Sequence, residues 1–227
     1  MWRVSADPQR FEAALEYFLK RTPMTEAQLE EVSARARERA FTLEGVTSLA
    51  LVSEVYGEVV KALKEGGDFA EFKTALLAKV SAQWNGSATN PSARLETVYR
   101  NAMQKAYNAG RYEQMRMDAV LKARPYWMVD AVMDGATSDI CKERDGVTLP
   151  ADDPWWQTNV PPYHHRCRTG IRTLTEKAAK RRGISETPNV EPLPGDFGRA
   201  PTQEEWQPSA ADYPPALWSI YQKKGAT

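Results

Sequence analysis

The sequence predicts an α+β protein: an N-terminal helical region, a small antiparallel β-sheet domain and an extended C-terminal arm rich in proline and aromatic residues. Apolar residues recur at helical spacing through about the first 120 positions. After Pro125 the pattern changes to alternation, which is typical of half-buried strands. Seven prolines follow Ile184, and this density excludes long helices and favours extended backbone.

Capping signals divide the N-terminal helical region, residues 1–90, into several helices. Thr25 with Gln28 three positions later forms a capping box, so we expect a helix to start there. Another apolar stripe stops at Gly66, a residue typical of helix ends. The helix after Thr25 is expected to bury one face, made of Leu29, Val32 and Ala36.

The longest predicted helix runs from Pro91 to about Met117 and carries an unusual polar face. Side chains seven positions apart lie on nearly one line of a helix, and several polar residues follow this spacing. Two interpretations stay open: a solvated helix face, or a polar seam that packs on a second domain or a partner. The polar face consists of Arg94, Arg100, Asn101, Gln104, Asn108 and Arg111.

Residues 124–175 predict a small antiparallel sheet, which together with the long helix forms the second expected domain, 91–183. Strands are expected over 126–135, 146–149 and 167–175. The prolines of 152–162 predict an irregular loop, and Thr175 caps a short basic helix. In the first strand one side is formed by Trp127, Val129, Ala131 and Met133.

The third part, 184–227, is the extended arm, with a final short helix expected in "PPALWSIY". A disordered linker would contain few aromatic residues, whereas this arm contains several. We therefore expect it to dock its aromatic side chains on its own domain or on a neighbour. The tryptophans predicted as interaction anchors are Trp155, Trp156, Trp206 and Trp218.

Composition narrows the class of protein. Lys+Arg and Asp+Glu both number 30, so bulk charge does not indicate a nucleic-acid protein. No apolar run approaches the roughly 20 residues that span a bilayer, and no secretory signal is expected at the start. Two cysteines do not make a disulfide framework. We expect a soluble protein made in a reducing cytoplasm, without a membrane partner.

Both histidines and one of the two cysteines lie within the stretch "PPYHHRCRTGIRTLT". The predicted structural cluster contains Cys141, His164, His165 and Cys167. Short antiparallel strands can bring the two thiols together, as buried thiols or as a disulfide. We interpret the cluster as a structural fastener, in which the histidines anchor the proline-rich loop over the sheet.

Two other uses of the cluster stay open. If a metal is present, Cys141, His165 and Cys167 are the expected zinc ligands, although structural zinc prefers four ligands in paired knuckles. Alternatively, Cys141 with a nearby histidine could serve as the nucleophile of a hydrolase or transferase. No local catalytic signature surrounds Cys141, so no catalytic residue is predicted.

Basic residues gather at the end of the predicted sheet domain. They could contact the phosphates of DNA, or the last of them could merely complement the dipole of their own helix. The candidate phosphate contacts are Arg166, Arg168, Arg172, Lys177, Lys180, Arg181 and Arg182.

Several motifs together resemble the phage Mu F-like minor head proteins, also described as head morphogenesis proteins of tailed phages. They are "TSDICKERDG" (137–146), "DDPWW" (152–156), the histidine stretch (161–175) and the helix "RLETVYRNAMQKAYNAGRYEQM" (94–115). The C-terminal tail resembles the family too. Some members have a fuller Cys/His set, and Arg144 stands where a second cysteine would be expected.

The resemblance implies structural work and no enzyme activity. Such proteins are minor capsid components that act near the portal during head assembly. The implied partners are the portal protein or the major capsid protein, with packaged DNA as a further contact and no small-molecule substrate. The implied location is the virion, and the host cytoplasm during assembly. The rival interpretations are a zinc-binding interaction or nucleic-acid module and a cysteine-dependent enzyme.

Overall fold

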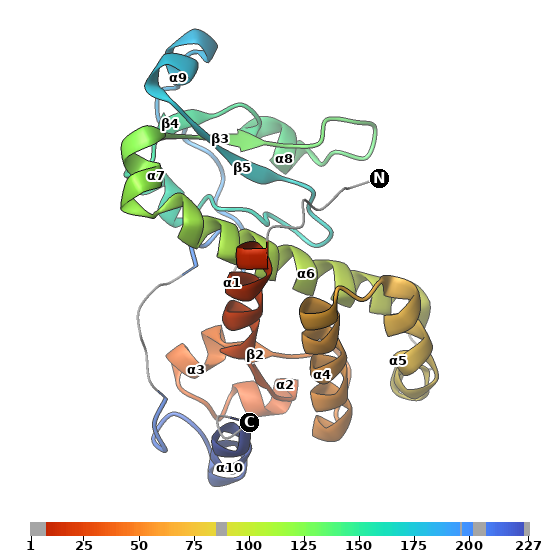
Figure 1. Ribbon diagram of the computed structural model, residues 1–227. Helices are drawn as coiled ribbons and strands as arrows, with labels where there is room; N and C mark the ends of the chain where they lie inside the picture. Colours follow the sequence, from red (N-terminus) through yellow and green to blue (C-terminus); the bar gives the residue numbers. More distant parts are fainter. Residues whose placement is uncertain (1–7, 85–89, 196, 202–207, 225–227) are drawn as a thin grey trace. The chain divides into compact units, whose positions relative to one another are not determined.

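The computed structural model describes residues 8–84, 90–195, 197–201 and 208–224 (Figure 1). The chain forms two compact units, each assembled from separate stretches. Residues 1–14 and 104–203 make the sheet unit, and residues 15–103 and 204–227 make the helical unit. Small sheets accompany many helices, so the predicted α+β class is confirmed.

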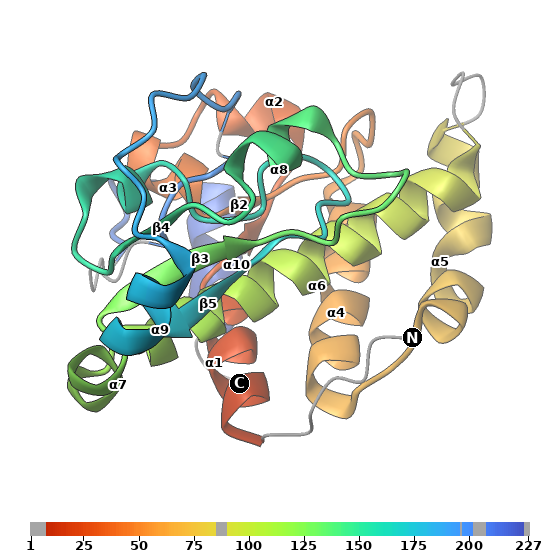
Figure 2. The ribbon, with the colours of Figure 1, turned by 90° about the horizontal axis from the view of Figure 1, so that it is seen from above.

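A three-stranded antiparallel sheet organises the sheet unit. The central strand, β3 (Tyr126–Asp130), pairs with β4 (Thr148–Pro150) on one side and with β5 (Gly170–Leu174) on the other. Figure 2 shows the three strands from above, with α8 (Asp139–Arg144) and α9 (Glu176–Arg182) beside them. Trp127 lies opposite Leu149 on one side and Thr173 on the other.

Successive side chains of β3 point to opposite faces of the sheet, so the strand contributes to two separate apolar clusters. Trp127 and Val129 face the main core of the unit, whereas Met128 packs with Leu174 and Ala179 on the other face. The main core takes side chains from α6 (Pro91–Met115), the sheet and the loops between the strands. Its buried members include Tyr112, Met115, Cys141, Leu149, Trp155, Trp156, Val160, Tyr163, Cys167 and Ile171.

Three expectations for this unit were wrong in detail. The first strand ends at Asp130, and Met133 beyond it is 56% exposed, because Asp134 and Thr137 close a turn there. The expected loop 152–162 contains a 3-10 helix, η1 (Pro154–Gln157), which Asp153 caps with Pro154 at its start. The last strand begins only at Gly170, so residues 167–169 precede it. Two helices, α7 (Asp118–Ala123) and α8 between the first two strands, were not expected.

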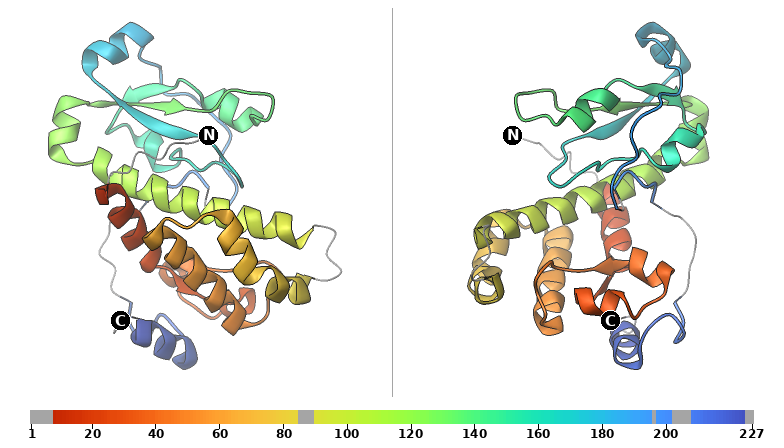
Figure 3. Two further views of the ribbon diagram at one scale, coloured as in Figure 1. Left: turned by 45° about the vertical axis from the view of Figure 1, so that its right-hand side comes forward. Right: turned by 180° about the vertical axis from the view of Figure 1, so that it is seen from behind.

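The helical unit contains the C-terminal part of α1 (Pro8–Leu19), the hairpin of α4 (Leu49–Glu65) and α5 (Phe69–Trp84), and α10 (Pro215–Lys224). Figure 3 shows α4 and α5 running side by side. Phe18 stacks on Tyr56 at 5.2 Å between ring centroids, and the ring of Phe41 meets both edge-on. Gly66 ends α4 in the left-handed conformation, as predicted from its sequence position.

The capping box at Thr25 forms as predicted, yet the helix it starts is short. α2 (Glu26–Leu29) ends after one turn, and Ser33 caps a second helix, α3 (Ala34–Glu38). Two parallel two-residue strands, β1 (Thr22–Pro23) and β2 (Ala40–Phe41), flank this pair of helices. The expected single stripe is therefore split, although Val32 and Ala36 are both buried.

Candidate functional site

Local turns bring the two cysteines of the sheet unit together. Ser138 caps α8 by accepting a hydrogen bond from the backbone N–H of Cys141, so Cys141 lies in the first turn of a helix. Cys167 ends a tight turn in which its N–H donates to the His164 carbonyl, and Arg166 takes a positive φ of 59°.

The two sulfur atoms and one imidazole form a compact group. Cys141 Sγ lies 3.2 Å from His164 Nε2 and 3.8 Å from Cys167 Sγ. Both cysteines are 3% exposed. The Thr169 hydroxyl donates to Cys141 Sγ at 3.1 Å. We call Cys141, His164 and Cys167 the thiol–imidazole cluster.

Hydrogen bonding fixes the tautomer of His164. Its Nδ1 lies 2.7 Å from the His165 carbonyl oxygen, and because a carbonyl can only accept, Nδ1 carries the proton. In the neutral ring, Nε2 is then the lone-pair nitrogen. Nε2 lies 2.8 Å from the Ser138 hydroxyl and faces Cys141 Sγ. The two thiol sulfurs and the unprotonated Nε2 of His164 therefore lie close together.

The two thiols differ in their acidity. The pKa of Cys141 is lowered chiefly by the hydrogen bond from Cys167, with the hydroxyls of Ser138 and Thr169 and His164 acting the same way and burial opposing them. The pKa of Cys167 is raised, because that same hydrogen bond holds its proton and because the thiol is buried. A single deprotonation of the pair therefore falls on Cys141.

The structure corrects the choice of histidine. His165 is exposed and its ring meets Phe197 edge-on, with 5.0 Å between centroids. Adjacent residues point apart, so only one of the two imidazoles can face the sulfurs, and that one is His164. Cys141, His164 and Cys167 offer ligand atoms that all lie within 4.8 Å of one another.

This arrangement could hold a metal ion, form a disulfide after rearrangement, or stay as free thiols. A thiol 3.2 Å from an imidazole also has the distance of a nucleophile pair. A nucleophile must reach its substrate, however, and Cys141 Sγ is covered by Cys167 and Thr169. The geometry favours a ligand or structural role over covalent catalysis.

The predicted tryptophan anchors separate into three cases. Trp155 and Trp156 are buried in the core of the sheet unit and meet edge-on, so their assignment as anchors for a partner does not fit the structure. The indole N–H of Trp156 donates to the Pro150 carbonyl. Trp218, on α10, is half-buried and stacks on Tyr221 at 5.4 Å. Trp206 lies outside the described residues.

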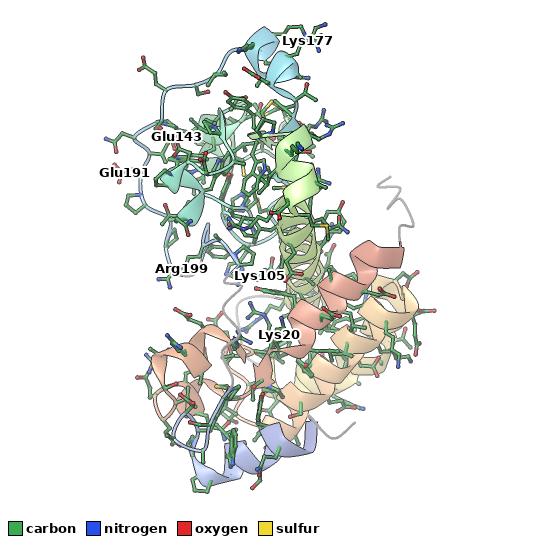
Figure 4. The ribbon with its side chains drawn as sticks, turned by 60° about the vertical axis from the view of Figure 1, so that its left-hand side comes forward. Lys20, Lys105, Glu143, Lys177, Glu191 and Arg199 are labelled. Atoms are coloured by element: carbon green, nitrogen blue, oxygen red, sulfur yellow. The ribbon has the colours of Figure 1, made fainter. Side chains whose placement is uncertain are left out.

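Several of the basic residues predicted to contact phosphate are already paired with carboxylates of the chain. Arg168 forms two hydrogen bonds of 2.6 Å with Asp134, Arg172 pairs with Asp130, and Lys180 pairs with Glu176. Arg166 is exposed. Lys177, Arg181 and Arg182 are exposed on α9, without an ion pair to the described part of the chain. Figure 4 shows Lys177 on the outer helix of the sheet unit.

Arg144 is a key residue that the sequence patterns missed. Its side chain is 1% exposed, although arginine is almost never fully buried without partners. It donates to Asn159 Oδ1 at 3.1 Å and to the Glu191 carbonyl at 2.7 Å, and it pairs with Glu143. Glu143 and Glu191 lie on one side of the unit in Figure 4. Arg144 therefore links α8 to the long loop and to the arm. The sequence contained one indication that this position is special: Arg144 stands where the family would lead us to expect a cysteine.

The polar face of α6 is partly a seam. Gln104, Asn108 and Arg111 donate to the backbone carbonyls of Thr169, Pro161 and Ile171, at 3.2, 3.0 and 2.9 Å. These bonds satisfy carbonyls of the segment that carries the thiol–imidazole cluster. For this half of the helix the polar residues do form a seam, but it packs on the sheet segment of the same unit and not on a second domain or a partner.

Comparison with known proteins gives a family. Residues 53–172 match the family described as "Phage Mu protein F like protein". The putative capsid assembly protein F of Escherichia phage Mu is 33% identical over 168 residues, which cover 68% of this chain. The Mu-like prophage FluMu F protein of Haemophilus influenzae is 31% identical over 159 residues, 66% of this chain.

The matches cover only part of the relatives. The chain spans 38% of the length of each of these two relatives. No solved structure matches the chain. Among the described residues, no helix has the length and apolarity needed to cross a membrane. Since the family match covers more than half of the chain and includes the thiol–imidazole cluster, the protein belongs to the phage Mu protein F-like family.

Proposed function

We propose that the chain works in the assembly of a phage or prophage head, as a minor capsid protein and not as an enzyme. The observation that carries this proposal is the 33% identity to a protein named as a putative capsid assembly protein. Because the chain spans 38% of that relative, the role of the whole relative is proposed here for this chain.

The position of the family motifs supports a structural role. Cys141, Tyr163, Cys167 and Thr169 all come from the motif stretches and are buried in the sheet unit. Their polar atoms bond to one another and to the backbone of neighbouring loops. A catalytic site would instead direct such groups into a cavity that a substrate can enter. The hollow beside Asn108, Arg111 and Tyr112 measures about 10 Å³, and a larger one of about 450 Å³ is lined by side chains of α9; neither is lined by Cys141, Tyr163, Cys167 or Thr169.

The proposed partners are other head proteins, the portal protein or the major capsid protein. The hydrogen bonds of the proline-rich arm support this. Its backbone bonds to the loops of the sheet unit, for example from the Gly198 N–H to the Pro162 carbonyl, and so gives these loops a fixed conformation that a partner protein can bind. Contact with packaged DNA is proposed only for the exposed end of α9, where Lys177, Arg181 and Arg182 lie. With three cations, the DNA affinity should fall only modestly as the salt concentration rises, because each phosphate contact adds about one to the slope of log affinity against log salt concentration.

The experiment is to tag the chain in its phage or prophage, induce it, and purify proheads and filled particles. We expect the chain in both fractions at low copy number, with chemical cross-links to the portal or to the major capsid protein. Its absence from both fractions would overturn the head role. Cross-links to neither protein would overturn the proposed partners while leaving the head role intact.

The DNA contact has its own test. Lys177→Glu combined with Arg181→Glu should reduce DNA retention by the purified chain and lower its salt slope by about two. Lys61→Glu, on the exposed face of α4, is the matched control and should change neither. Equal retention by the double variant and the wild type would remove DNA from the list of partners.

A further inference from the structure

We propose that the thiol–imidazole cluster binds one zinc ion, through Cys141 Sγ, Cys167 Sγ and His164 Nε2, with a water molecule in the fourth position. The proposal does not depend on the head role. It rests on the donor atoms, their spacing, and the hydrogen bonds that orient them.

Two of the three donor spacings are close to those of a tetrahedral zinc ion, and all three donor atoms lie within 4.8 Å of one another. Zinc–sulfur bonds of about 2.3 Å and zinc–nitrogen bonds of about 2.0 Å place two sulfurs about 3.8 Å apart, and sulfur and nitrogen about 3.5 Å apart. The two sulfurs of the cluster are 3.8 Å apart, and Cys141 Sγ is 3.2 Å from His164 Nε2. A disulfide would require about 2.05 Å between the sulfurs.

The donors select the metal. Soft thiolates with an imidazole favour zinc over magnesium or calcium, which prefer oxygen ligands. Binding removes one proton from each thiol to solvent, so two thiolates balance the charge of Zn²⁺. A neutral unit of this kind suits a site in which both cysteines are 3% exposed, because an uncompensated charge would be costly there.

His164 is already oriented as a metal ligand. Its Nδ1–H donates to the His165 carbonyl at 2.7 Å, which leaves Nε2 unprotonated and 3.2 Å from Cys141 Sγ. The Ser138 hydroxyl lies 2.8 Å from the same Nε2, and it must turn away when Nε2 binds zinc. Histidine ligands of metals usually have such a partner on the other ring nitrogen. The Thr169 hydroxyl, 3.1 Å from Cys141 Sγ, can continue to donate to the thiolate in the bound state.

The fourth position falls to solvent. Within the described ranges, no further carboxylate, histidine or cysteine lies close enough to join the three ligands. His164 is only partly buried, so water can reach the ion from that side. The site therefore has the three-ligand composition of an open zinc centre, in contrast to a closed four-ligand knuckle.

The test begins with the full-length chain, purified without chelator and analysed for metals by mass spectrometry. We expect about one zinc ion per chain, and after exchange a cobalt spectrum with thiolate charge-transfer bands and tetrahedral d–d bands. A folded chain without zinc after incubation with Zn²⁺ and dialysis would overturn the proposal. A Cys141–Cys167 disulfide in the fresh protein, or a cobalt spectrum without thiolate bands, would do the same.

Variants distinguish ligation from folding. His164→Ala should reduce zinc content to a trace, whereas His165→Ala, which changes the neighbouring exposed imidazole, should retain it. Thr169→Val keeps all three ligands and should bind zinc with reduced affinity. Circular dichroism shows whether each variant is folded. Zinc retention by a folded His164→Ala variant, or equal loss in His165→Ala, would contradict the assigned ligand set.

Discussion

The two halves of the C-terminal arm are held in place by different forces. The described residues of 184–201 belong to the sheet unit and contain no helix or strand, whereas residues 208–224 belong to the helical unit and end in α10. The first half combines hydrogen bonds from its backbone with the partly buried Val190, Leu193 and Ala200, whereas the second buries the apolar side chains of Tyr213 and Leu217. The comparison shows that high proline content alone does not determine how a segment is ordered.

The first half exchanges hydrogen bonds with the loops of the sheet unit. Ser185 N–H donates to the Thr148 carbonyl at 2.9 Å. The N–H of Gly198 donates to the Pro162 carbonyl at 3.0 Å, and its carbonyl accepts from Val160 at 2.7 Å. Each proline removes one donor, so the remaining N–H groups and all the carbonyls carry the attachment.

The second half depends on apolar burial. Leu217 is 0% exposed, and together with Tyr213 it packs against Met24, Val32 and Ala36 of the helical unit. Burying a leucine side chain stabilises a fold by about 2 kcal/mol. One exposed carboxylate, that of Asp212, adds a polar link to this segment.

The largest effect is expected from Arg144→Met. The substitution keeps the apolar stem but leaves the buried Asn159 Oδ1 and the Glu191 carbonyl without their donor. We expect the free energy of unfolding to fall by about 4 kcal/mol, measured by urea denaturation. Lys142→Met, on the exposed face of the same helix, should cost less than about 0.5 kcal/mol. Equal effects of the two variants would show that Arg144 does not hold the first half.

Leu217→Ala tests the second half. Loss of this side chain leaves a cavity between α10 and α3, and we expect a loss of about 3 kcal/mol. Leu217→Met conserves volume and should cost less than about 1.5 kcal/mol. Hydrogen exchange should rise most in α2, α3 and α10. A variant as stable as the wild type would contradict attachment by apolar burial.

The sequence predicted the helices well because their caps are local. Thr25, Gly66 and Thr175 all lie at helix ends, as predicted, and each signal needs only a few neighbouring residues. The pairing of β1 with β2 was not predictable in this way, because each strand has two residues and no alternation to detect. The burial of Arg144 depends on partners 15 and 47 positions away.

The site was predictable in its members but not in its geometry. The sequence placed Cys141, two histidines and Cys167 in one cluster, and the structure brings three of them together. The choice between His164 and His165 depends on the turn at Arg166, whose positive φ is uncommon for a non-glycine residue. No periodicity in the sequence predicts such a turn.

Gly198→Ala tests the backbone attachment of the first half directly. Gly198 has a φ of +76°, and an added Cβ would collide with the Thr158 carbonyl oxygen and the Leu193 side chain. We expect a loss of about 2 kcal/mol, with faster hydrogen exchange at Val160 and Gly198. Gly135→Ala is the matched control, since nothing lies within 4 Å of its added Cβ. Unchanged exchange at Val160 would show that the arm is held elsewhere.

The smallest effect is expected from the polar link of the second half. The Asp212 carboxylate accepts hydrogen bonds from the Ser209 N–H, the Ser33 hydroxyl and the Ser209 hydroxyl, and these lower its pKa. A lowered folded-state pKa gives stability that is present above the unfolded value of about 3.9 and is lost as the pH falls below it. Asp212→Asn should therefore reduce the melting temperature slightly at neutral pH and flatten its decline in acid. Ser33→Ala keeps the carboxylate and should retain part of that decline. An acid profile of Asp212→Asn identical to the wild type would show that apolar burial alone holds α10.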